Sequence, residues 1–166
     1  MASNFEFLDQ AFPVLSAFGR QAEAYCLNDS NSCLIKLGMI GETIVNLMFT
    51  YDRLPFPKDN TSISRIDTLY REGLLTNDLT DILHLMRKKR NKAVHENYES
   101  ESDAKILLQM AHSLCQWFMQ TYGDWNYQQS PFIMPSDTTG IPAIIGEQEG
   151  DNGETLIRQA ESVAIA

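Results

Sequence analysis

The sequence lacks the short motifs that mark the most familiar catalytic centres. It contains no glycine-rich phosphate loop, no HExxH zinc motif and no GxSxG nucleophile motif. It also lacks the cluster of two acids and a lysine that forms a DNA nuclease core. These absences exclude the common zinc protease, serine hydrolase and P-loop classes as interpretations of this sequence.

Cysteine and histidine are both scarce. Cys26, Cys33 and Cys115 are an odd number without a CxxC pair, which argues against a disulfide framework or a zinc site and fits a reducing compartment. We expect all three in the helix packing. None of the three histidines is paired at helical spacing with another histidine or an acidic ligand set, so no metal site is predicted.

Signals for export or membrane insertion are also missing. The first ten residues carry acids but neither a basic segment nor an apolar stretch, and no run of residues approaches the length of a membrane span. The sequence therefore predicts a cytoplasmic protein without membrane contact.

The chain has fewer positive than negative charges, and many of its positive charges lie in one segment. The formal net charge is -9, which disfavours general attraction to nucleic acid or anionic membranes. Five of the thirteen Lys and Arg residues nevertheless fall within residues 87–92. This run is either a solvated helix face or a contact for phosphate or an acidic partner. The residues that would make such a contact are Lys88, Lys89, Arg90 and Lys92.

Apolar residues recur at helical spacing along most of the chain, and a hydrophobic content of 43% is enough for a sizeable core. We predict an all-α bundle of about five helices. Gly38 and Gly41 lower the helix propensity of the second helix, which predicts a close crossing there. The apolar patterns cover residues 5–25, 34–48, 63–70, 77–95 and 104–122.

The pattern changes after Asp124. Aromatic residues among prolines predict an extended tail, so the bundle is assigned to residues 1–135. Residues 136–153 mix Gly, Pro, Thr and acids without a period and are predicted to be a flexible linker. Residues 154–166 restart a helical pattern that stops without a capping signal. We interpret the chain as the N-terminal piece of a longer protein whose further domains follow this helix.

One row of polar residues borders the apolar stripe of the predicted helix over residues 77–95. Arg87, Asn91 and His95 follow one another at intervals of four, and Glu42 interrupts the otherwise apolar second helix. Buried charges need partners. We therefore predict a structural polar network of Glu42, Arg87, Asn91 and His95.

A catalytic alternative uses Arg90 and His95. An arginine can hold a phosphodiester while a histidine near its ordinary pKa transfers a proton to or from a ribose oxygen, without a metal. This chemistry would make the chain a metal-independent RNase. Binding without chemistry is a third interpretation of the same residues.

Four segments resemble the N-terminal region of the R subunit of type I restriction enzymes. They are SNFEFL at residues 3–8, LIKLGMIGE at 34–42, LMRKKRNKAVHE at 85–96 and FIMP at 132–135. Their order and spacing are similar, and the resemblance covers about residues 3–135. It implies a helical domain of the HEPN-like group, followed by a linker, a nuclease domain and a DEAD/DEAH-type translocase that together cut unmethylated foreign DNA.

The resemblance implies a docking role without a complete catalytic centre. The expected partners are the rest of the R subunit and the other restriction-complex subunits, with a DNA backbone contact through the basic run. No cofactor is expected in this chain, whereas ATP and Mg²⁺ are expected for the domains that follow.

The chain departs from the family pattern at two positions. Relatives tend to carry Arg where this chain has Gly38, and Gly where it has Arg90. Two other functions stay open: a HEPN-type RNase in which two chains pair and present Arg90 and His95 in one cleft, and an interaction domain of an unrelated defence protein.

Overall fold

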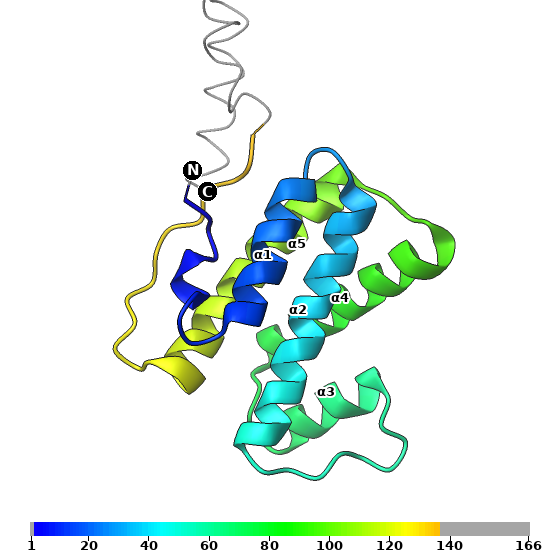
Figure 1. Ribbon diagram of the computed structural model, residues 1–166. Helices are drawn as coiled ribbons and strands as arrows, with labels where there is room; N and C mark the ends of the chain where they lie inside the picture. Colours follow the sequence, from blue (N-terminus) through cyan, green and yellow to red (C-terminus); the bar gives the residue numbers. More distant parts are fainter. Residues whose placement is uncertain (1, 137–166) are drawn as a thin grey trace, which may run out of the picture.

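The computed structural model describes residues 2–136, and this part of the chain is an all-helical bundle with an extended C-terminal tail (Figure 1). The prediction of about five helices is confirmed. Two short helical turns, η1 and η2, flank the bundle in sequence. The elements are η1 Glu6–Leu8, α1 Pro13–Tyr25, α2 Ser30–Tyr51, α3 Ser62–Arg71, α4 Asn77–Glu96, α5 Glu101–Phe118 and η2 Met119–Gly123.

Polar side chains fix where four of the helices begin. Asp29, Thr61, Thr76 and Ser100 each accept a backbone N–H from the first turn of α2, α3, α4 and α5, respectively. For α4 the cap is Thr76, whose hydroxyl accepts the N–H of Leu79.

Helix α2 lies at the centre of the bundle and contacts α1, α3, α4 and α5 (Figure 1). Its buried side chains include Leu37, Ile40, Ile44 and Met48. The expectation that no segment is long enough to span a membrane was wrong for this helix, which has the necessary length and apolar composition. More than half of its apolar window is buried inside the bundle, as in the core helix of a soluble protein.

The predicted close crossing at the glycines of α2 is confirmed at Gly38. A Cβ atom placed on Gly38 would lie 2.4 Å from Cβ of Arg90 on α4. The same atom on Gly41 would be in ordinary contact, 3.4 Å from Leu83. Glycine at position 38 thus allows α4 to approach α2 closely.

The two ends of the described chain are fastened to each other. The Asn4 side chain donates to the Ile133 carbonyl and accepts from the Ile133 N–H, both at 2.8 Å. Its amide also donates to Glu23 of α1 at 2.7 Å. Figure 1 shows the tail, in orange, running beside the blue N-terminal segment. Asn4 therefore attaches the predicted extended tail to the bundle through hydrogen bonds.

The three cysteines are fully buried, as predicted. Cys26 follows α1 and Cys33 lies in the first turn of α2. Burial raises the pKa of the Cys115 thiol on α5, so this residue acts as an apolar packing group. The linker predicted for residues 136–153 falls outside the described residues apart from Ser136, and the further helix at 154–166 lies wholly outside them.

Candidate functional site

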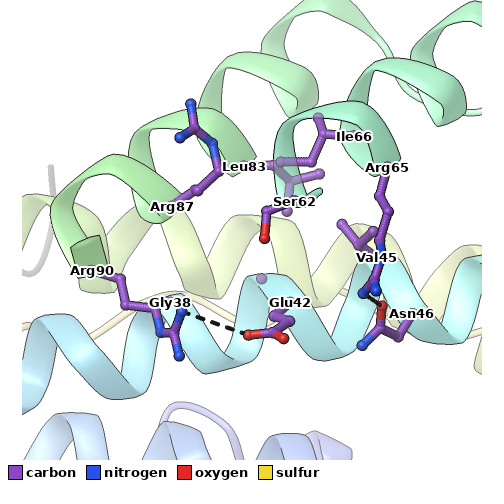
Figure 2. A pocket seen from close by; sticks show the side chains of 11 residues that line it. Gly38, Glu42, Val45, Asn46, Ser62, Arg65, Ile66, Leu83, Arg87 and Arg90 are labelled. Atoms are coloured by element: carbon purple, nitrogen blue, oxygen red, sulfur yellow. Dashed lines mark hydrogen bonds and ion pairs between the residues drawn. The ribbon is translucent and has the colours of Figure 1, made fainter. Parts of the chain in front are cut away.

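Three helices line a small, partly open pocket that contains part of the predicted site. Its volume is about 30 Å³. Helices α2, α3 and α4 each contribute to its wall (Figure 2). The lining residues are Gly38, Gly41, Glu42, Val45 and Asn46 from α2, Ser62, Arg65 and Ile66 from α3, and Leu83, Arg87 and Arg90 from α4.

Glu42 faces Arg90 across this pocket. The Oε2 atom of Glu42 lies 3.8 Å from a terminal nitrogen of Arg90. This separation is longer than the 2.7–2.9 Å typical of a charge-assisted hydrogen bond, so the pair is loose. Both side chains are more than a third exposed, which weakens their attraction further. The Arg90 stem packs on Gly38, which aims the guanidinium at Glu42.

Arg87 has no partner of this kind. Figure 2 shows its terminal nitrogens turned away from Glu42. Its Nε atom is buried and makes no hydrogen bond within residues 2–136, and the same is true of Nε of Arg90. A buried donor without an acceptor is uncommon and costs free energy. The pocket therefore contains two unsatisfied guanidinium donors.

Arg65 is held rigidly on the α3 side of the pocket. It donates to Asn46 at 2.8 Å and to Asn60 at 2.7 Å. Its guanidinium also lies 4.7 Å from the centre of the Phe56 ring. Sequence reasoning missed Arg65, Asn46 and Ser62, because nothing in their spacing shows that α3 closes this pocket.

Asn91 and His95 lie outside this pocket. Both side chains are exposed, and neither has a hydrogen-bond or ion-pair partner among the described residues. The structure thus brings Glu42 and Arg87 to one pocket and leaves the other two members of the predicted network apart. No hydrogen bond or ion pair joins Arg90 to His95 in the described part of the chain. The structural role of the four residues, and the RNase role of Arg90 and His95, stay predictions.

Much of the basic run is engaged within the bundle. Lys89 forms an ion pair with Asp103 of α5 at 2.8 Å, and this bond raises the pKa of the lysine and lowers that of the aspartate. The Nζ atom of Lys92 lies 4.2 Å from the centre of the Tyr98 ring. Lys88 is exposed and has no such partner within residues 2–136. Of the predicted contact residues, Lys88 is the one most available to an external partner.

A second, more open groove lies between α3 and α4. His84 contacts Asp67 at 3.0 Å through Nε2, while its Nδ1 is buried without a partner. Asp81, Arg87 and Lys88 also line this groove. The acids and bases there balance each other. Within residues 2–136, no group of three or more His, Cys, Asp or Glu side chains is arranged to hold a metal ion.

The four segments that carry the family resemblance meet in two contacts. Residues 34–42 and 85–96 meet where Arg90 lies on Gly38 and faces Glu42. Residues 3–8 and 132–135 meet where Asn4 pairs with Ile133. The two departures from the family pattern, Gly38 and Arg90, touch each other.

Comparison with known proteins gives one family and one relative. A family described as Domain of unknown function (DUF4145) matches residues 20–138. The endonuclease subunit of the type I restriction enzyme EcoKI from Escherichia coli (strain K12) is 26% identical over 134 residues. That alignment covers 80% of this chain but 11% of the relative. No solved structure matches the chain.

Proposed function

The chain belongs to the family described as Domain of unknown function (DUF4145), and we propose that it acts as a docking domain of a type I restriction endonuclease. The observation that carries the proposal is the similarity to the EcoKI endonuclease subunit, whose 134 aligned residues are nearly as many as the described bundle contains. By this proposal the chain works in the cytoplasm as part of a system that cuts foreign DNA.

The geometry supports docking better than catalysis. The pocket between α2, α3 and α4 contains arginines and a glutamate, but none of the three histidines. A metal-independent nuclease needs a proton-transferring group within hydrogen-bond reach of the bound phosphate. Arg90 is turned toward Glu42, and His95 is exposed outside this pocket. We therefore assign no reaction to the bundle itself.

In this role the partners are the rest of the R subunit and the other subunits of the restriction complex. ATP and Mg²⁺ would be used by domains outside this chain. The exposed Lys88 is the residue we assign to a contact with an acidic partner surface or the DNA backbone. Lys89 and Arg90 contribute less to such a contact, because Asp103 and Glu42 already face them.

Deletion of the bundle from the complete endonuclease subunit tests this assignment. We expect a subunit without residues 2–136 to lose co-purification with its partner subunits and to lose restriction of unmethylated phage in cells. The ATPase activity of the remaining subunit controls for its folding. Full restriction by an ATPase-competent truncated subunit would contradict a docking role.

A further inference from the structure

The pocket between α2, α3 and α4 has an excess of positive charge. Three arginines line it, Arg65, Arg87 and Arg90, against the single carboxylate of Glu42. The buried Nε atoms of Arg87 and Arg90 have no acceptor within the described residues. Since an unsatisfied buried donor costs free energy, a ligand that supplies acceptor oxygens would be stabilised here.

The first turn of α3 adds further donors at the same place. Ser62 is the first residue of this helix and lines the pocket, with its hydroxyl directed toward Glu42 in Figure 2. The side chain of the cap residue Thr61 accepts only the N–H of Ser64 in this turn. The N-terminal end of α3, which carries a partial positive charge, therefore meets the pocket together with the arginines.

The excess charge of the lining restricts what the ligand can be. A phosphodiester carries one negative charge, so it would leave part of that excess unbalanced. A phosphodiester has a sugar on each side, whereas a terminal phosphate can enter with its ester oxygen pointing out. A terminal phosphate also carries a charge of about -1.5 to -2 at neutral pH, close to the excess of three arginines over one glutamate.

We propose that this pocket binds a terminal phosphate group, either of a small phosphorylated molecule or of a phosphorylated nucleic-acid end. Arg65, fixed by Asn46 and Asn60, forms the rigid wall. Arg90 exchanges its loose 3.8 Å contact with Glu42 for a bond to the phosphate. Arg87 has no partner within residues 2–136 that would resist rotation of its terminal nitrogens toward the same phosphate. The inference goes beyond the docking role and does not depend on it.

Calorimetric titration of the purified chain with inorganic phosphate tests the pocket at constant ionic strength. We expect saturable binding that weakens about tenfold or more in Arg87→Gln and in Arg90→Gln, because each variant loses charge-assisted hydrogen bonds. Lys88→Gln is the matched control: it removes the same charge from the neighbouring position, which lies outside this pocket. It should change the affinity less than twofold.

In contrast to the arginine variants, Glu42→Gln should raise the affinity for phosphate. It removes the carboxylate that competes for Arg90, so phosphate should bind several-fold more tightly. Circular dichroism and thermal melting establish that each variant folds. Absence of phosphate binding by the folded wild type would overturn the proposal, as would equal losses in Arg87→Gln and Lys88→Gln, since these indicate general charge attraction.

Three further ligands distinguish the sources of the phosphate: a nucleoside monophosphate, an oligonucleotide with a 5′-phosphate, and the same oligonucleotide with a 5′-hydroxyl. We expect the nucleoside monophosphate, the 5′-phosphorylated oligonucleotide or both to bind in a way that depends on Arg87. The oligonucleotide with a 5′-hydroxyl should show no Arg87-dependent binding. Equal, Arg87-dependent binding of both oligonucleotides would overturn the choice of a terminal phosphate. None of these outcomes requires a restriction subunit, so failure of the docking role is separately recognisable.

Discussion

His112 makes the stability of the bundle depend on pH at the level of a single residue. The side chain is 2% exposed, and its ring meets the edges or faces of Phe5, Phe7 and Phe132. Gln116 is its hydrogen-bond partner at 3.3 Å, and its Nε2 atom is buried without one. Burial in this apolar surrounding lowers the pKa of His112 to about 4.

The predicted consequence is a loss of stability as the pH falls below about 6.5. The unfolded chain then binds a proton at His112 that the folded chain does not, so the stabilising contribution is complete above pH 6.5 and declines toward pH 4. From pH 7 to pH 5 we expect the free energy of unfolding to fall by about 2 kcal/mol. Urea unfolding at both pH values measures this change. A His112→Leu variant should lack it, and an identical pH dependence in that variant would refute the assignment.

Arg90 and His95 permit a direct test of the catalytic alternative. We expect no RNA cleavage by the purified chain in EDTA, because the arginine faces Glu42 and the histidine lies apart from it. Gel analysis of a labelled RNA, with Arg90→Ala and His95→Ala for comparison, provides the measurement. Cleavage by the wild type that both folded variants abolish would replace docking with an RNase function.

At the scale of elements, the crossing of α2 and α4 depends on the small size of residue 38. We predict that Gly38→Ala destabilises the bundle by about 1–3 kcal/mol, since the new Cβ would lie 2.4 Å from Cβ of Arg90. Gly41→Ala is the matched control on the same helix, with its nearest contact at 3.4 Å. The small packing cost of Gly41→Ala should be offset by the gain of about 1 kcal/mol in helix propensity. Thermal denaturation of both variants compares the two sites.

A double variant tests whether the contact between residues 38 and 90 determines the stability of this crossing. Adding Arg90→Gly to Gly38→Arg removes one bulky side chain from the crossing while inserting another, so the double variant should be more stable than Gly38→Arg alone. Additive losses from the two substitutions would show that the two positions do not interact.

The helices could be predicted from the sequence, whereas their mutual arrangement could not. Apolar spacing and the cap at Ser100 identify α5, and the glycines of α2 indicate a close crossing. The partner at that crossing depends on how the helices pack, which local periodicity does not encode. Glu42, Arg87 and Arg90 were singled out from the sequence and line the pocket, whereas Arg65 and Ser62, which also line it, were missed. Asp103 is another example, because only the folded chain shows that it neutralises Lys89.

At the scale of the whole molecule, contacts between distant segments close the bundle and orient its tail. Asn4 joins the N-terminal segment to Ile133, and Gln116 of α5 accepts the N–H of Ser130 at 2.7 Å. These bonds fix the direction in which the chain leaves the bundle.

The docking role assigned to the exposed Lys88 is tested most directly by measuring binding of the purified chain to the other restriction subunits. Calorimetric titration at two salt concentrations should show saturable binding that weakens with salt. Lys88→Glu should weaken it about tenfold, whereas Lys58→Glu, the same charge reversal on the exposed loop before α3, should leave it unchanged. Absence of binding by the folded wild-type chain, or equal effects of the two reversals, would contradict the docking role assigned to this surface.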